Sequence, residues 1–133
     1  MLTLAQRGQR EVAQRVLATD AAHLAITVIS VEEQLTGWYT LLRKTTDRAK
    51  LARVYQRLAE TVTYLGGWSI LPFTETAIDR SAQLRSLKRN IGKMDLAIAA
   101  ITLEHGGILV TRNTRDFQRV PGLIIEDWSA PLS

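Results

Sequence analysis

Oxygen-bearing side chains follow the apolar segments of this 133-residue chain at three separate places. They are Glu32 and Glu33 after the apolar run 24–29, Asp95 at the start of an apolar helical segment, and Thr111, Asn113 and Asp116 after the run 108–110. Carboxylates brought together in this way repel one another unless a cation joins them. Mg²⁺ or Mn²⁺ suits an all-oxygen site, and such an ion activates water for an in-line displacement at phosphorus.

Each of these residues also has a purely structural interpretation. Ser30 and Glu33 have the spacing of a helix capping box, and this is the favoured reading of Glu33 from the residues alone. We expect Glu32 to be solvated. Asp95 stands in a helix first turn, where a carboxylate complements the helix dipole, and this reading balances that of a metal ligand. Asn113 and Asp116 have the spacing of a simple helix cap.

The composition limits the chemistry that remains. The chain has no Cys and only 2 His, which excludes disulfides, thiolate metal sites and cysteine nucleophiles and disfavours a His cluster. The absence of Cys fits a reducing, cytoplasmic location. A net charge of +4 fits a polyanionic partner. We expect no membrane association, because no apolar stretch approaches the ~20 residues of a spanning helix.

Apolar periodicity predicts alternating helices and strands in a single domain, residues 1–133. Helices are expected at about 4–19, 30–44, 46–65, 74–89 and 95–105, with a short helical turn at 113–120, and strands at 24–29, 68–71, 108–111 and 123–128. Apolar strands linked by helices indicate an α/β fold with a parallel sheet covered on both faces. Ligands of such sheets bind outside the carboxyl ends of the strands, where the acids fall.

The C-terminal segment NIGKMDLAIAAITLEHGGILVTRNTRDFQRVPGLIIEDW resembles the closing part of VapC-type PIN domains, the toxin nucleases of bacterial toxin–antitoxin pairs. The matching features are Asp95 before Ile98-Ala99-Ala100, then Thr111, Asn113, Asp116-Phe117, Pro121-Gly122 and Glu126-Asp127-Trp128. Upstream, ITVISVEEQLTG is similar to the second acidic segment of that family, a strand followed by Glu-x-x-x-Gly, which selects Glu33 rather than Glu32.

The resemblance implies a PIN-like three-layer α/β/α fold with a mainly parallel central sheet, and a Mg²⁺- or Mn²⁺-dependent endoribonuclease. Glu33 and Asp95 would hold the metal, and Thr111, Asn113 and Asp116 would complete the site, with Asp116 supplying the charge that many members place at Asn113. It also implies a tRNA substrate, a homodimer and inhibition by a small VapB-like antitoxin.

One departure from the family pattern concerns the first strand. Family members begin with a strand that ends in Asp-Thr-Asp or Asp-Thr-Asn, whereas Leu2-Thr3-Leu4-Ala5-Gln6-Arg7-Gly8 resembles the segment that comes after this strand. We therefore expect the central first strand and its acid to be missing, with either a longer natural chain upstream or a truncated fold. Two hypotheses result: an endoribonuclease, and a catalytically impaired binding protein that retains antitoxin, RNA or dimer contacts. The chain as given is expected to be weakly active or inactive.

Two further groups of residues suit partners. The basic residues Lys93, Arg112, Arg115 and Arg119 flank the predicted site and suit RNA phosphates, although a solvated basic surface is the simpler reading of any one of them. Trp38, Tyr39, Leu42, Val54 and Tyr55 lie on two consecutive helices. We expect mostly helix packing from them, and the resemblance adds a role in the antitoxin or dimer groove.

Overall fold

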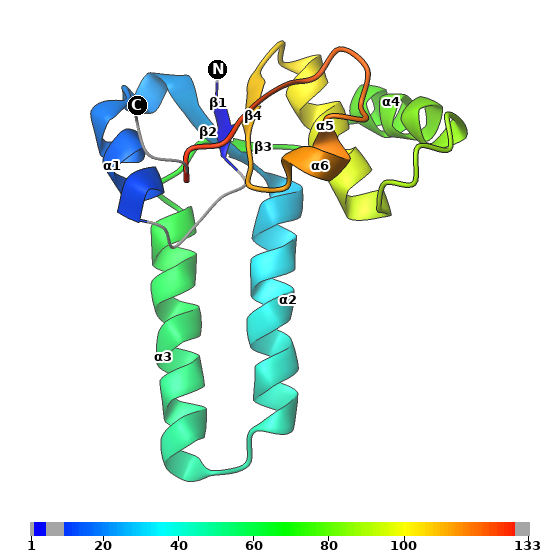
Figure 1. Cartoon of the computed structure of the whole chain (residues 1–133). Helices are drawn as coiled ribbons and strands as arrows, with labels where there is room; N and C mark the ends of the chain where they lie inside the picture. The colour runs from blue at the N-terminus through cyan, green and yellow to red at the C-terminus, as the bar shows by residue number, and fades with distance from the viewer. Residues whose placement is uncertain (1, 5–9, 130–133) are drawn as a thin grey trace.

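A computed structural model describes residues 2–4 and 10–129 of the chain. Its core is a five-stranded, all-parallel sheet in the order β3-β2-β1-β4-β5. The strands are β1 (Leu2–Leu4), β2 (Leu24–Thr27), β3 (Ile70–Leu71), β4 (Ile108–Val110) and β5 (Ile124–Glu126). The predicted α/β class and parallel sheet are confirmed (Figure 1).

The centre of the sheet is filled by β1, which corrects two expectations. Leu2 and Thr3 pair with Leu24 and Ala25 of β2 on one side, and β1 pairs with β4 on the other. The central strand is therefore present, and the helix predicted from residue 4 begins only at Arg10. The physical reason is pairing: three residues between two buried strands satisfy the backbone groups of both neighbours, and periodicity within the segment does not contain that information.

Six α-helices surround the sheet. They are α1 (Arg10–Ala18), α2 (Val28–Lys44), α3 (Arg48–Leu65), α4 (Glu75–Ser86), α5 (Lys93–Glu104) and α6 (Thr114–Phe117), with a 3₁₀ turn η1 at Ala21–His23. The side chains of Asp47 and Thr74 cap α3 and α4 by accepting hydrogen bonds from the backbone N–H groups of Lys50 and Ala77. Both helix starts agree with the prediction. None of the described helices is long and apolar enough to cross a membrane.

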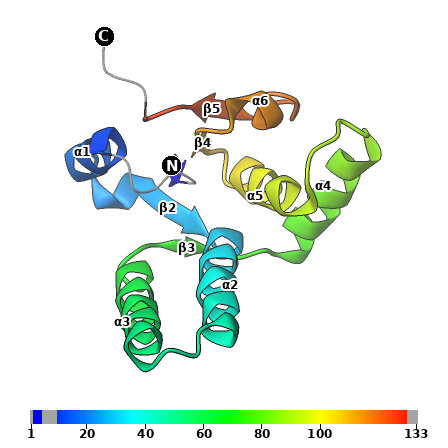
Figure 2. The same ribbon diagram turned by 60° about the horizontal axis from the view of Figure 1, so that its bottom comes forward.

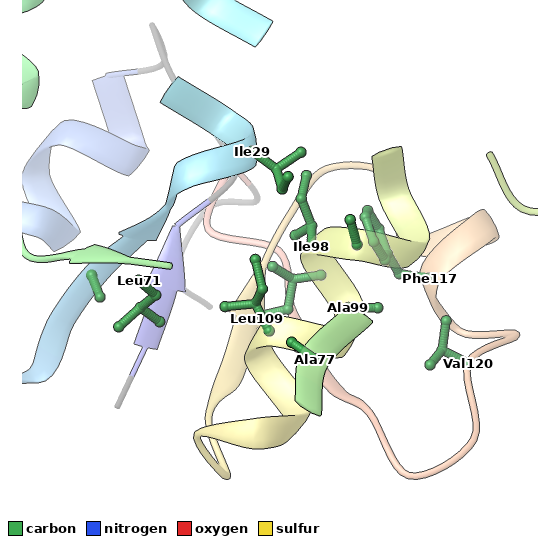
Figure 3. Packing of buried hydrophobic residues seen from close by; sticks show 11 residues of the cluster. Ile29, Leu71, Ala77, Ile98, Ala99, Leu109, Phe117 and Val120 are labelled. Atoms are coloured by element: carbon green, nitrogen blue, oxygen red, sulfur yellow. The ribbon is translucent and has the colours of Figure 1, made fainter. Parts of the chain in front are cut away.

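The two faces of the sheet carry separate cores because side chains alternate along each strand. Ala25 and Leu109 belong to one cluster, which α5 fills with Ala97, Ile98 and other buried residues (Figure 3). Leu24 and Val110 belong to the other cluster, together with Val12, Ile26, Leu65 and Trp128. Leu96–Thr102 of α5 are all buried, between the sheet and α4. This continuous burial fixes the helix that carries Asp95.

The helices α2 and α3 form an antiparallel arm that extends away from the sheet (Figures 1 and 2). The indole N–H of Trp38 donates a 2.9 Å hydrogen bond to Thr61 Oγ1, which joins the two helices partway along the arm. Along α3, Leu51, Val54 and Leu58 are half-buried, whereas Val62 is exposed. The arm therefore has little core of its own beyond the helix pair.

The start of α2 differs from the capping-box prediction. The strand β2 ends at Thr27, whose hydroxyl accepts a 3.1 Å hydrogen bond from the backbone N–H of Ser30. Thr27 is therefore the N-cap, and Val28 and Ile29 are helical rather than part of the strand. The predicted cap Ser30 and capping role of Glu33 are wrong. The β-branched Val28 and Ile29 extend the apolar pattern of β2, which conceals the boundary.

Candidate active site

Three helices that begin near the carboxyl edge of the sheet carry the predicted acids. Glu33 lies in the second turn of α2, which follows β2, and Asp116 lies in α6, which follows β4. Asp95 lies in the first turn of α5. In parallel strands the carboxyl ends share one edge, so the order of elements brings these acids toward a common place.

The electrostatics show which acids are near neighbours. Partial desolvation raises the pKa of Glu33, and the carboxylates of Asp95 and Glu32 raise it further. Desolvation also raises the pKa of Asp95, followed by the charge of Asp116. Asp95 thus stands electrostatically between Glu33 and Asp116. Repulsion of this kind opposes full ionisation of the group in the absence of a cation.

Among the residues that the structure describes, no cation pairs with Glu33 or Asp95 to relieve this repulsion. Within residues 2–4 and 10–129, the Glu33 and Asp95 carboxylates form no ion pair and accept no hydrogen bond. Because Thr27 caps α2, Glu33 has no capping role, and the described residues show no other structural role for it. Two partly desolvated, unpaired carboxylates are a donor set that a hard divalent cation prefers.

The arrangement falls short of a complete metal cage. The described residues contain no group of three or more His, Cys, Asp or Glu close enough together to hold one metal ion. The acids therefore interact as successive pairs rather than as a closed triad. Carbonyl, amide or hydroxyl oxygens and waters would have to supply the remaining ligands, as is common for Mg²⁺.

The turn after β4 holds Asp116 in place. The Thr111 hydroxyl, on a buried side chain, accepts a 3.0 Å hydrogen bond from the backbone N–H of Asn113. Asn113 Nδ2 donates to Asp116 Oδ2 at 3.1 Å, and Asn113 Oδ1 accepts from the backbone N–H of Asp116 at 3.4 Å. The alternative reading of Asn113 as a helix cap is thereby confirmed. Thr111 influences Asp116 indirectly, because its hydroxyl fixes the backbone of Asn113.

The basic residues around the acids differ in how freely they are available. Lys93, Arg112 and Arg115 are exposed and form no ion pair with the described residues. Arg119 lies 3.8 Å from Asp116 Oδ1, and the same nitrogen donates to the carbonyl oxygens of Arg89 and Asn90. Arg119 therefore ties the loop between α4 and α5 to α6, which the sequence did not indicate.

The five arm residues predicted for the antitoxin or dimer groove also differ in how far they are exposed. Trp38, Leu42 and Val54 are half-buried, and Trp38 bonds Thr61, so the packing interpretation holds for them. Tyr39 is 46% exposed and Tyr55 is 55% exposed. Elsewhere, Glu32, His23 and His105 are exposed, and Trp128 is buried in the second core.

The PIN domain family matches residues 2–123 of the chain. A tRNA(fMet)-specific endonuclease VapC from Shigella flexneri is 35% identical over 78 residues, which is 56% of this chain and 59% of that protein. The chain thus spans well under two thirds of the curated relative it matches.

Two solved structures extend the comparison. The crystal structure of DNA-bound VapBC from Salmonella typhimurium is 24% identical, covers 96% of this chain and 97% of that one, and superposes with a TM-score of 0.76. A toxin–antitoxin complex from Klebsiella pneumoniae is 27% identical over 88% of this chain and 84% of that one, with a TM-score of 0.64. The family match covers nearly the whole chain, and the fold agrees with it. The chain belongs to the PIN domain family.

Proposed function

We propose that the chain is the toxin of a toxin–antitoxin pair, a metal-dependent endoribonuclease that hydrolyses RNA phosphodiester bonds. The observation that carries the proposal is the electrostatic series Glu33–Asp95–Asp116, drawn from three helices at the carboxyl edge of the sheet. The family match and the VapC relative support the nuclease class. The name of that relative supports tRNA as the substrate, and a cytoplasmic location accompanies such a substrate.

Glu33, Asp95 and Asp116 are the residues that would hold Mg²⁺ or Mn²⁺. A bound ion of this type activates water and stabilises charge at phosphorus. The chain itself supplies the rigid turn: Thr111 fixes the backbone of Asn113, and Asn113 orients the Asp116 carboxylate. Asp95 is half-buried and Glu33 is exposed, so desolvation strengthens the attraction for a cation mainly at Asp95.

The proposal is tested by incubating the purified protein with total tRNA in Mg²⁺, Mn²⁺ or EDTA. We expect metal-dependent cleavage that Asp95→Asn abolishes. The control is Asp79→Asn, the same chemical change at an exposed position of α4. Cleavage that persists in EDTA, or that Asp95→Asn leaves unchanged, contradicts the proposal.

A second candidate, a PIN-fold binding protein with impaired catalysis, is favoured by the absence of a three-acid group from the described residues. The sequence also has no Asp or Glu before Glu11. Compared with the family pattern, in which the first strand ends in Asp, the site has one acidic ligand fewer. This difference weakens metal binding and leaves the remaining acids repelling one another. We accordingly expect the cleavage to be slow. Complete inactivity with retained RNA and antitoxin binding supports this candidate, and vigorous cleavage that depends on Asp95 removes it.

RNA binding is assigned to the exposed cations near the acids, Lys93, Arg112 and Arg115, with Arg119 in a structural role beside them. Each phosphate contact releases counterions and makes the affinity dependent on salt, with a slope of about 0.7 per contact on single strands. An RNA affinity that does not change between low and high salt contradicts this assignment.

The partner protein is proposed to be a VapB-like antitoxin that contacts the arm. The related structures from Salmonella typhimurium and Klebsiella pneumoniae are toxin–antitoxin assemblies. The exposed Tyr39 and Tyr55, with the half-buried Trp38, Leu42 and Val54 on the same two helices, offer an apolar surface to a partner helix or to a second copy in a homodimer.

Pull-down with the product of the neighbouring small open reading frame tests the antitoxin contact. Capture that Tyr39→Ser and Tyr55→Ser abolish together supports the contact, with Tyr64→Ser on the same arm as the control. Capture by the double variant at the level of the unchanged protein removes the arm from the antitoxin interface. Sedimentation of the protein alone decides separately between monomer and homodimer.

A further inference from the structure

A pocket of about 390 Å³ lies between α4 and α5, outside the acidic site. Its apolar lining includes Phe73, Ile78 and Leu96, and its polar lining includes Ser81, Arg85 and Lys93. The volume falls within the range of about 300–1,000 Å³ that is usual for small-molecule sites. An apolar cavity edged by cations suits a flat, apolar group that carries negative charge at its margin.

The charged side chains that line this pocket, among the described residues, are both positive. A smaller neighbouring cavity shares Arg85 and Leu96 with it and adds Lys88 and Arg89 from the loop after α4. Neither cavity has an acid in its lining. Among the described residues, no ion pair is formed by the four cations of the two cavities, Arg85, Lys88, Arg89 and Lys93. Four unpaired cations around two adjoining hollows favour a polyanion over an isolated apolar ligand.

The first turn of α5 carries a residue of the pocket, Lys93, and a residue of the acidic site, Asp95. Lys93 and Leu96 are three residues apart and so share the helix face that meets α4. Asp95 stands between them in sequence and projects from a different side of the same turn. One strand of nucleic acid passing the N-terminal end of α5 can reach both.

We propose that this pocket, lined by Phe73, Ile78, Arg85, Lys93 and Leu96, is a nucleotide subsite that accepts one unpaired base of single-stranded RNA bound at the acidic site. The inference rests on the proposed function. The base would lie against the apolar walls, where stacking tolerates any base because every base has a π face. Arg85 and Lys93 would contact the flanking phosphates, and the rest of the strand would continue toward Asp95.

An acidic peptide is the main competitor for such a surface. RNA is favoured because Lys93 lines the pocket and lies two residues before Asp95 of the proposed cleavage site, and because four cations line the two cavities. Sequence reasoning missed Arg85 altogether, since its relation to Lys93 depends on the packing of α4 against α5.

The test measures the binding of a fluorescent single-stranded RNA by anisotropy in EDTA, which separates binding from cleavage. Ala82 of α4 also lines the pocket, so Ala82→Phe fills the pocket without changing charge, and we expect it to weaken binding about tenfold. Arg85→Gln with Lys93→Gln should lower the salt slope by about 1.4, or 0.7 for each cation. Arg53→Gln, an exposed arginine on the arm, is the control and should bind like the unchanged protein.

A second measurement identifies the base. A series of RNAs, each with one abasic position, should reveal a single position at which the missing base weakens binding to the unchanged protein. The same series should show no such position with Ala82→Phe. Circular dichroism confirms that this exposed α4 variant remains folded.

The outcomes separate this inference from the proposed function. RNA binding that is strong but unaffected by Ala82→Phe and by the double charge variant overturns the subsite and leaves the nuclease proposal intact. The same result accompanied by loss of antitoxin capture assigns the pocket to a peptide and also overturns the subsite. Failure of the unchanged protein to bind RNA at all overturns both.

Discussion

The Glu33 carboxylate on α2 lies near enough to the Asp95 carboxylate on α5 for the charge of Asp95 to raise the pKa of Glu33. The Asp95 pKa is raised in turn by desolvation and by the charge of Asp116. These acids come from distant parts of the chain, yet the described residues give Glu33 and Asp95 no neutralising partner. The fold therefore maintains like charges in proximity, which costs stability and is expected where a cation or a proton is needed.

The first prediction concerns pH and Asp95→Asn. A raised pKa in the folded state means that the folded protein binds protons more tightly than the unfolded chain, so stability falls as pH rises above the ordinary Asp value of 3.8. At pH 7 Asp95→Asn should therefore raise the free energy of unfolding, by about 0.5–1 kcal/mol because the site is partly solvated. Below that ordinary value the carboxyl is neutral in both states, and the gain should vanish.

Thermal unfolding at pH 7 and at acid pH measures this effect, with Asp79→Asn as the matched control. Equal melting temperatures for Asp95→Asn and the unchanged protein at pH 7 would show that the repulsion is absent. A gain that grows on acidification would reverse the sign of the linkage and contradict the assignment of the raised pKa.

The second prediction concerns the arm. The Trp38 indole N–H donates to Thr61 Oγ1 at 2.9 Å and is the described side-chain hydrogen bond between α2 and α3. Thr61→Val removes the acceptor and leaves the half-buried indole N–H unpaired, which should cost about 1–2 kcal/mol. Urea unfolding measures the loss. Thr63→Val, whose hydroxyl bonds only its own helix backbone, is the control.

The third prediction concerns Gly37, which lies in the interior of α2 one turn after Glu33. A Cβ built at this position meets nothing within 4 Å. Gly37→Ala should therefore stabilise the protein by about 0.5–1 kcal/mol, the ordinary helix preference of Ala over Gly. A lower urea midpoint for Gly37→Ala would show that packing within the chain requires the glycine.

The fourth prediction concerns Thr3 in the central strand. Its side chain is fully buried beside Ala25 and Leu109, and its hydroxyl has no hydrogen-bond partner among residues 2–4 and 10–129. Thr3→Val replaces the unpaired hydroxyl with a methyl group and should stabilise the fold by about 1 kcal/mol. Destabilisation by this substitution would mean that Thr3 does not occupy the buried central position.

The sequence predicted those parts of the fold that local chemistry determines. The starts of α3 and α4 were predictable because a short polar side chain, Asp47 or Thr74, precedes a helical stripe, and α5 was predictable from its continuous apolar run. The start of α2 was missed because Val28 and Ile29 continue the β-branched pattern of β2. The strand β1 was missed because three residues become a strand only through their neighbours.

The proximity of the candidate acids, although not their role, was predictable to a similar extent. The resemblance selected Glu33 over Glu32, and the structure places Glu33, Asp95 and Asp116 in one electrostatic series. The structural roles of Arg119 and the pocket beside Arg85 depend on contacts between α4, α5, α6 and their loops. Such contacts leave no periodic signal in the sequence.

In the proposed function a divalent cation binds at Asp95 with the carboxylate of Glu33 or of Asp116, and other oxygens complete its coordination. Mn²⁺ binding measured by electron paramagnetic resonance tests this site most directly. The unchanged protein and Asp79→Asn should each bind one Mn²⁺ per chain at this site, with Mg²⁺ as a competitor. Asp95→Asn should lose that binding while remaining folded. Equal Mn²⁺ binding by Asp95→Asn and Asp79→Asn would show that Asp95 is not a ligand of the cation.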